Sequence, residues 1–274
     1  MPEIAEVETF RRQLSPLLSG EVIQSFSCSH PRSIRRHENV DDFIQHVVGV
    51  EIDEVLRHGK YLALRLANGD YLNVHLRMSG RFLTYDQSSY EAGNNPKHSH
   101  VIFTTDKNVF VFVDPRTFGE LWITRGLTPE MTRGLDSFDS TVAKREKVLL
   151  DIRSTNKPLK TVLLDQNILS GIGNIYADEI CADARLNPTR KYSTLTQGEL
   201  NRLNQSCGSV LTQAVLLRGS SLRDESFRDL YGEIGNFQTR HVVHAKKNCA
   251  RCGNFVEKTK TAGRSTYFCP NCQK

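Results

Sequence analysis

Four cysteines near the C-terminus have the spacing of a metal site. They form two C-x-x-C pairs, Cys249 with Cys252 and Cys269 with Cys272, separated by sixteen residues. Each pair brings two thiolates to one ion, and two pairs close a tetrahedral shell, for which zinc is the usual occupant and rubredoxin-like iron the alternative. A closed shell of this kind is structural and leaves no open position for catalysis. Because this tail has few apolar residues, we expect the metal to fold it.

A second chemical group lies at the other end of the chain. Removal of Met1 would leave Pro2 as the first residue, a secondary amine with the carboxylate of Glu3 beside it. An α-amine is far less basic than a lysine side chain, so more of it is unprotonated and nucleophilic at pH 7. The simpler interpretation is that Pro2 only starts a helix, since its fixed φ suits the first turn.

The positive charge is concentrated in the tail. Residues 240–274 hold eight Lys or Arg and one Glu, a net charge of +7, whereas the whole chain of 274 residues carries +5. A clustered basic surface is typical of nucleic-acid binding, and a solvated charged tail is the alternative. The first 30 residues contain no continuous apolar stretch and no 18-residue apolar run occurs, so we expect a cytoplasmic protein without a membrane partner.

The elements that must position these groups follow from periodicity. Apolar residues at helical spacing predict a helix over 4–18, ended by Ser19-Gly20. Strands are expected at 61–66 and 71–76, joined by the hairpin signal Asn68-Gly69, and again at 101–103 and 109–113. Helices are expected farther on at 141–153, 158–167, 174–185 and 197–217, the last with a capping box from Thr196 to Glu199.

These elements predict an α+β protein with several domains. The expected parts are a β domain, a helical domain with a polar loop near its end, and a metal module. Their boundaries are 2–130 for the β domain, 131–140 for a linker, 141–239 for the helical domain with its loop at 218–239, and 240–274 for the metal module.

Two further positions could hold phosphate. The run Gly171-Ile-Gly173-Asn174 reads as tight turns between two helices, with Asn174 as the N-cap of the second, and a helix N-terminus with exposed amides can bind an anion. Arg264 would lie near the tip of a hairpin between the cysteine pairs, where it could bind phosphate. Simple helix capping and a solvated turn arginine are the alternatives.

The ordered set of motifs resembles a known family. Pro2-Glu3, His75-Leu-Arg-Met78-Ser-Gly, Asp114-Pro-Arg116-Thr-Phe118-Gly, the Asn174 turn and the four cysteines occur in one order that is similar to the formamidopyrimidine-DNA glycosylases, and the match spans the chain. The resemblance implies an N-terminal β-sandwich with flanking helices, a helix–two-turns–helix domain and a C-terminal zinc β-hairpin, with DNA in the cleft between the two halves. It implies one structural Zn²⁺, a monomer, and a partner that is double-stranded DNA with oxidised bases or abasic sites.

The resemblance also implies a reaction. Pro2 would attack the sugar C1′ and expel an oxidised purine such as 8-oxoguanine or a formamidopyrimidine. The resulting iminium would act as an electron sink for β- and then δ-elimination. Glu3 would act as general acid and base and Glu6 as a second acidic group that orients the site. Lys60 and Arg264 complete the implied catalytic set, Lys60 through phosphate contact and proton transfer.

Further implied contacts concern the DNA. A base inside a duplex must be flipped out before it can be excised. Met78, Arg116 and Phe118 match the residues that fill the resulting gap. The implied DNA contacts are His75, His98, Arg116, Asn174 and Arg264.

The sequence departs from the family pattern at several points. The loop that begins Arg218-Gly-Ser-Ser differs from the usual Gly-Gly-Thr-Thr, so base preference is the least secure inference. The run Val242–Asn248 before the first zinc ligand and Ala5 also differ from the usual residues, and the lysine that contacts DNA near the linker could be Lys157 or Lys160. Two alternatives remain: an endonuclease VIII-like enzyme for oxidised pyrimidines, and a zinc-dependent DNA-binding protein without catalysis.

Overall fold

A computed structural model describes residues 2–222 and 227–274, which form two compact units. Unit 1 holds the chain up to Thr132 together with Arg218–Gly235, and unit 2 holds Arg133–Leu217 and Asn236–Lys274. The sequence grouped 218–239 with the helical region, whereas Arg218–Gly235 belongs to unit 1. Residues 223–226 of that loop, like Met1, lie outside the described residues.

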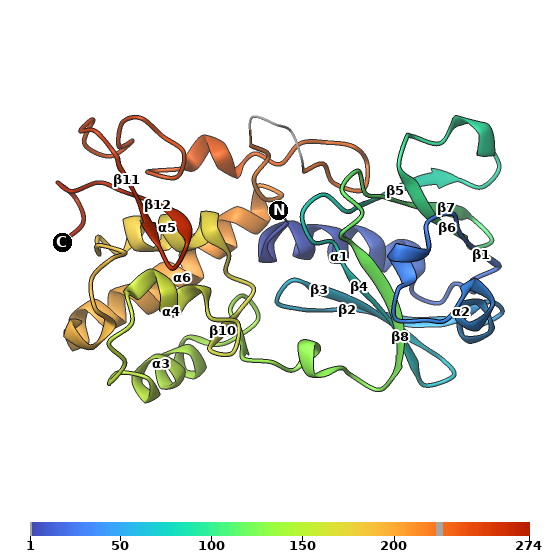
Figure 1. The fold of residues 1–274 in the computed structure, drawn as a ribbon, viewed down its shortest axis with the longest axis horizontal. Helices are drawn as coiled ribbons and strands as arrows, with labels where there is room; N and C mark the ends of the chain where they lie inside the picture. Colours follow the sequence, from blue (N-terminus) through green and yellow to red (C-terminus); the bar gives the residue numbers. More distant parts are fainter. Residues whose placement is uncertain (1, 223–226) are drawn as a thin grey trace. The chain divides into compact units, whose positions relative to one another are not determined.

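Unit 1 is built on two four-stranded antiparallel sheets (Figure 1). One has the strand order β2-β3-β4-β8 and the other the order β1-β6-β7-β5. The expected hairpin is confirmed, because β3 and β4 flank Gly69, whose φ of +86° suits a tight turn. The elements of unit 1 are α1 (Ile4–Leu18), β1 (Ser25–Cys28), η1 (Pro31–Ile34), α2 (Val40–Val47), β2 (Ile52–His58), β3 (Tyr61–Leu66), β4 (Asp70–His75), β5 (Arg81–Asp86), η2 (Ala92–Asn94), β6 (Ser99–Thr104), β7 (Asn108–Val113), β8 (Glu120–Arg125) and η3 (Pro129–Met131).

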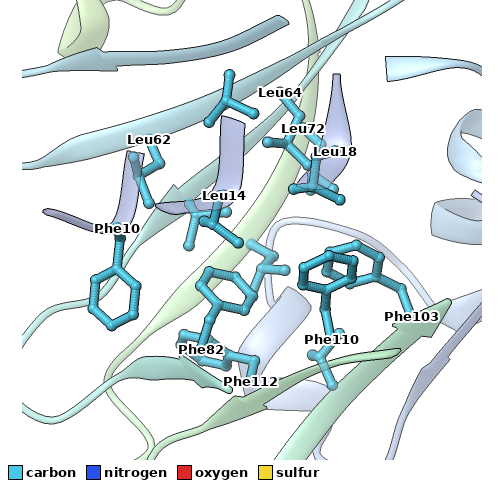
Figure 2. Close-up of a cluster of buried hydrophobic side chains, with 14 of the residues drawn as sticks. Phe10, Leu14, Leu18, Leu62, Leu64, Leu72, Phe82, Phe103, Phe110 and Phe112 are labelled. Atoms are coloured by element: carbon cyan, nitrogen blue, oxygen red, sulfur yellow. The ribbon is translucent and has the colours of Figure 1, made fainter. Parts of the chain in front are cut away.

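Helix α1 has the predicted bounds, but it is more deeply buried than an amphipathic surface helix. Every residue from Ile4 to Phe10 is buried, including Glu6 and Glu8. Figure 2 shows why: Leu14 and Leu18 of this helix lie between the leucines of β3 and β4 on one side and the phenylalanines of the second sheet on the other. The N-terminus of the chain is therefore held by the core of unit 1.

Unit 2 contains the predicted helices, with shorter bounds. The capping box from Thr196 to Glu199 is confirmed at the start of α6. The helix predicted at 158–167 ends at Leu164, because the Gln166 side chain turns the chain by hydrogen-bonding the Leu164 and Ile172 carbonyls. The elements are β9 (Leu135–Asp136), α3 (Val142–Asp151), α4 (Leu159–Leu164), β10 (Leu169–Ser170), α5 (Asn174–Asp183), η4 (Tyr192–Thr194), α6 (Gln197–Leu216), η5 (Phe237–Arg240), β11 (Glu257–Thr261) and β12 (Arg264–Phe268).

The segment expected as a linker, 131–140, has structure of its own. Its strand β9 pairs in parallel with β10 of unit 2, so this part of the chain is tied into the helical region. None of the described helices is long and apolar enough to cross a membrane.

Candidate active site and nucleic-acid interface

The N-terminal proline and its neighbouring acid are buried at the start of α1. Pro2 and Glu3 precede the helix, and Glu3 is its N-cap residue. Glu6, one turn on, accepts the Glu3 backbone N–H through Oε2 at 2.8 Å. The carboxylate of Glu6 therefore fixes the backbone at the residue next to the candidate nucleophile.

The same carboxylate holds a second segment of unit 1. Glu6 Oε1 accepts the backbone N–H of Ser220 at 2.7 Å. The adjoining Gly219 has a φ of +77°, and a Cβ on it would lie 2.5 Å from Glu6 Oε1. Glycine is thus needed here, both for the left-handed backbone and for the close approach of Glu6. Glu6 links the start of α1 to the segment that begins the 218–235 loop.

The far end of that loop is also anchored on α1. Asp229 is fully buried and accepts hydrogen bonds from Gln13 Nε2 at 2.9 Å and from Arg218 Nη1 at 3.0 Å. Gln13 Oε1 in turn accepts the N–H of Leu230 at 3.0 Å. The ring of Phe227 packs edge-on against Phe10 with a centroid distance of 5.8 Å. These contacts explain why the loop belongs to unit 1.

Lys60 lies in the tight turn between β2 and β3. The strands pair up to His58 and Tyr61, so Gly59 and Lys60 alone make the turn, and Gly59 has a φ of +56°. Tyr61 faces His75 across β3 and β4, and their ring centroids are 4.4 Å apart. Strands β3 and β4 thereby bring Lys60 close to His75, which is one of the residues predicted to contact DNA.

His75 has a defined protonation state. Burial, followed by the positive charge of Arg77, lowers the pKa of His75 to about 3. Its Nδ1 accepts the backbone N–H of Arg77 at 2.9 Å, so the neutral ring carries its proton on Nε2. His75 is therefore a neutral N–H donor throughout the range from pH 5 to 8, which suits a contact to a phosphate oxygen.

The three residues predicted to fill the gap left by a flipped base, here called the wedge residues, are Met78, Arg116 and Phe118, and they lie on two loops of unit 1. Arg116 and Phe118 are exposed, and the Arg116 guanidinium carbon is 5.4 Å from the centre of the Phe118 ring. Asp114 shapes their loop by accepting the N–H groups of Arg116 and Gly119. The hydroxyl of Ser79, next to Met78, also donates to Asp114. Asp114 therefore ties the loop of Met78 to the loop of Arg116 and Phe118.

A cluster of arginines adjoins this pair of loops, and the sequence reasoning missed it. The buried Glu120 pairs with Arg35 at 2.8 Å, Arg36 at 3.3 Å and Arg77 at 2.8 Å. Arg35 also donates to the Phe118 carbonyl at 3.1 Å. The signal in the sequence was the run Arg32-Ser-Ile-Arg35-Arg36, which reads as an ordinary polar segment. Three guanidinium groups on one carboxylate leave net positive charge beside the wedge residues.

His98, another predicted DNA contact, is exposed at the edge of the same loop. Its carbonyl accepts the backbone N–H of Asp114 at 3.0 Å. All the predicted site residues before the helical region lie in unit 1: Pro2, Glu3, Glu6, Lys60, His75, Met78, His98, Arg116 and Phe118.

In unit 2, Asn174 begins α5 but does not cap it. The N-cap residue is Gly173, one position before the predicted one, and no side-chain cap bond is present. The side-chain Oδ1 of Asn174 is buried without a hydrogen-bond partner among the described residues. Capping therefore does not account for this residue, and its amide remains a candidate for a ligand at the helix N-terminus.

The two candidate lysines near the linker have different surroundings. Lys160 is fully buried, and its Nζ contacts both Asp178 Oδ1 and the Ser265 carbonyl at 2.7 Å. Lys157 is exposed and lies 3.5 Å from Asp165. Because burial removes Lys160 from contact with DNA, Lys157 is the remaining candidate of the two.

Buried acids of α5 hold the segment before the zinc ligands. Glu179 accepts the backbone N–H groups of Val242, Val243 and His244 at 2.7–3.0 Å. Asp178 pairs with His244 Nδ1 at 2.8 Å. The sequence departs from the family pattern in this segment, and the structure shows that side chains of α5 bind it to unit 2.

The four predicted cysteines meet in one cluster. All four Sγ atoms lie within 4.8 Å of one another, and Cys252 and Cys269 are 3.5 Å apart. A tetrahedral zinc with Zn–S bonds of ~2.3 Å places its sulfurs ~3.8 Å apart, so the cluster fits one structural zinc ion. Arg264 is exposed and follows directly on the two-residue turn of the β11–β12 hairpin, as predicted.

Three family models match this chain in the order of these parts. The formamidopyrimidine-DNA glycosylase N-terminal domain matches residues 1–121, the formamidopyrimidine-DNA glycosylase H2TH domain matches 134–226, and the zinc finger found in FPG and IleRS matches 246–274. The matches define a DNA glycosylase with a helix–two-turns–helix domain and a zinc finger.

Curated proteins and solved structures agree over the full length. The chain is 37% identical to a formamidopyrimidine-DNA glycosylase of Exiguobacterium and 38% identical to one of Pelotomaculum thermopropionicum, with at least 99% of each chain covered. It is similar to the crystal structure of the MutM (FPG) protein of Thermus thermophilus, with a TM-score of 0.85, 36% identity and coverage of 99% and 98%. The complex of Lactococcus lactis Fpg with abasic-site DNA has a TM-score of 0.85, 29% identity and 99% coverage of both chains. The chain belongs to the formamidopyrimidine-DNA glycosylase family.

Proposed function

We propose that this protein is a bifunctional DNA glycosylase and abasic-site lyase of base-excision repair, acting as a monomer on oxidised purines in duplex DNA. The observation that carries the proposal is Pro2 beside Glu3 at the buried start of α1, in a chain of this family. Solved complexes of Lactococcus lactis Fpg contain DNA with Fapy-dG, with an abasic site and with an oxidised pyrimidine. We propose that the protein acts in the bacterial cytoplasm, on nucleoid DNA.

The proposed reaction uses the chain's own groups. The unprotonated Pro2 amine forms a bond to the sugar C1′ while the bond from C1′ to the base breaks, and the base leaves with a proton. Glu3 protonates the ring oxygen as the ring opens, which gives a cationic iminium. The iminium accepts the electron pair when a proton is lost from C2′ and the 3′-phosphate departs, and δ-elimination then releases the 5′-phosphate.

The remaining residues are proposed to bind and orient the DNA. Lys60 contacts phosphate and transfers protons in the eliminations, and Arg264 contacts phosphate. The other DNA contacts are His75, His98, Asn174 and Arg116. Met78, Arg116 and Phe118 fill the gap left by the flipped base, a role that suits the exposed Arg116–Phe118 pair. The zinc ion supplies no chemistry and holds the hairpin that carries Arg264.

Borohydride trapping tests the nucleophile. With a duplex that carries one 8-oxoguanine opposite cytosine, the wild-type protein should form a reduced protein–DNA crosslink that maps to Pro2. Pro2→Gly should lower crosslink yield at least tenfold, whereas Pro16→Ala on the exposed side of α1 should not change it. N-terminal sequencing checks that Met1 is absent. If the protein binds DNA tightly but never crosslinks, the lyase proposal fails in favour of a non-catalytic binding protein.

Substrate range needs a separate comparison. We expect excision of 8-oxoguanine and formamidopyrimidine to exceed excision of thymine glycol in matched duplexes under single-turnover conditions. The reverse order would support the endonuclease VIII-like alternative. Either order leaves the nucleophile assignment intact, because the trapping experiment reads it independently.

Gly219→Ala should impair excision through Glu6. The new Cβ would meet the Glu6 carboxylate at 2.5–2.8 Å, and the residue would have to keep a φ of +77°. Because Glu6 is already held by the N–H groups of Glu3 and Ser220, we expect the start of α1 or the loop to shift and excision to fall about 10- to 100-fold. Single-turnover kinetics measure this, with Gly198→Ala as the control, since a Cβ there meets nothing within 4 Å. An unchanged rate in Gly219→Ala would show that the Glu6 contact is dispensable.

A further inference from the structure

An ion pair is buried where α1 meets β2. Arg57 Nε lies 2.9 Å from Glu8 Oε2, the Arg57 side chain is 0% exposed and the Glu8 side chain is 2% exposed. Glu8 also accepts hydrogen bonds from Arg11 and Arg12 of its own helix. A buried ion pair is often no more stabilising than a well-packed apolar pair of similar volume. Stability alone therefore does not explain why charged residues occupy this site.

Arg57 connects this pair to the turn of Lys60. Its Nη1 donates to the carbonyl of Gly59 at 3.3 Å, and Gly59 with Lys60 forms the two-residue turn between β2 and β3. Glu8 lies on α1, the helix that follows Pro2 and Glu3 in the chain. The planar guanidinium thus contacts, at once, the helix of the candidate nucleophile and the backbone residue before Lys60.

We propose that the Glu8–Arg57 pair is a positioning device that sets Lys60 against Pro2 for the elimination steps. The inference rests on the proposed function of Pro2 and Lys60. A rigid helix fixes Glu8 at four residues, ~6 Å along the axis, from Ile4, the first helical residue, which follows Pro2 and Glu3 directly. Arg57 binds both the Glu8 carboxylate and the Gly59 carbonyl. The backbone next to Lys60 is therefore fixed relative to α1. Displacements of ~1 Å between reacting groups can reduce rates about 100-fold.

The charge on Glu8 does not change at any pH where the reaction would run. Burial favours its neutral form, but hydrogen bonds from Arg11, Arg12 and Arg57 outweigh burial and lower the pKa of Glu8 to about 2. The contact to Arg57 is therefore kept from pH 5 upward. A positioning device with this property adds no titration of its own to the pH profile.

The test separates attack by Pro2 from the later elimination. The substrate is a duplex with a preformed abasic site, which removes base excision from the measurement. Borohydride trapping reports iminium formation at Pro2, and single-turnover strand cleavage without borohydride reports elimination. The variant Glu8→Leu/Arg57→Met removes both charges and leaves neither one buried alone. The matched control is Glu54→Gln/Arg65→Met, which removes an exposed pair with 3.2 Å separation on the same β2–β3 hairpin.

We expect the crosslink yield of the Glu8→Leu/Arg57→Met variant to stay within about threefold of wild type. Its rate of strand cleavage by elimination should fall about 10- to 100-fold. Adding Lys60→Ala to this variant should lower elimination far less than Lys60→Ala does in the wild type, because the two changes disable one function. The control should match wild type in both assays. Glu8→Asp, which keeps the charge and shortens the side chain, provides a second variant that should show the same lower ratio of elimination to trapping.

Other outcomes overturn the proposal. If elimination and trapping fall together in both Glu8 variants, the pair supports the fold in general and does not position Lys60. If both rates stay at wild-type values, the pair has no part in the reaction. Failure of the proposed function is a distinct result, because the wild-type protein itself would then give no crosslink on abasic DNA.

Discussion

Lys160→Met is expected to lower the free energy of unfolding of unit 2 by about 3–5 kcal/mol, the usual cost of removing one partner of a buried ion pair. Lys160 and Asp178 are both 0% exposed and lie 2.7 Å apart. The substitution leaves the Asp178 carboxylate in the interior, where it still contacts His244, and it also removes the donor to the Ser265 carbonyl. Hydrogen exchange at the amides of α4 and α5, followed in increasing denaturant, measures the loss.

Two comparisons identify the cause of that loss. Lys157→Met removes a lysine that is 56% exposed and 3.5 Å from Asp165, so the free energy of unfolding should change by less than about 1 kcal/mol. Adding Asp178→Asn to Lys160→Met removes the uncompensated charge and should recover part of the stability. A loss below about 1 kcal/mol in Lys160→Met would contradict the expectation that Lys160 stabilises unit 2 through its contacts to Asp178 of α5 and Ser265 of β12.

The sequence predicted the features that depend on local patterns. Helix α1 was predicted with its observed bounds because its apolar spacing is regular and Gly20 follows it. The zinc cluster was predicted because two C-x-x-C pairs specify their geometry almost alone. The hairpin at Gly69 and the Thr196 capping box belong to the same kind, since each involves residues only a few positions apart.

The sequence could not predict the buried charged contacts. Glu8 and Arg57 are 49 positions apart, and Lys160 lies 18 positions from Asp178, so no short motif links either pair. Charged residues are seldom buried, and each of these reads as a surface residue until its partner is known. For the same reason, the sequence did not predict the arginine cluster around Glu120. It also left Lys160 as a candidate for DNA contact.

The loop at 218–235 shows a different cause of error. Its composition is polar, and it follows α6 directly, so the sequence favoured grouping it with the helical region. Its contacts are with α1, and the bond from Ser220 to Glu6 spans 214 positions. Phe227 and Leu230, both buried in the core of unit 1, were the available signal, because apolar residues in a polar loop indicate packing elsewhere.

Cys252→Ser is expected to prevent zinc binding and to unfold the hairpin that carries Arg264. Strands β11 and β12 bury few apolar side chains, and the small cluster beneath them includes two of the zinc ligands, Cys249 and Cys269. The apparent binding free energy of structural zinc is about 10–16 kcal/mol, so the fold of this module depends on the ion. Native mass spectrometry should show loss of one zinc per chain, and the amides of β12 should lose hydrogen-exchange protection.

Glu179 of α5 sets the boundary of that unfolding. The Val242–His244 segment is held by Glu179, which does not involve the metal, so its amides should stay protected while those beyond Cys249 exchange. Affinity for duplex DNA should fall, and the slope of log K against log salt should lose about one unit if Arg264 neutralises one phosphate. Cys28→Ser, outside the cluster, should keep zinc and affinity. Full protection of β12 in the zinc-free protein would show instead that Lys160 and the contacts to α5 suffice to fold the hairpin.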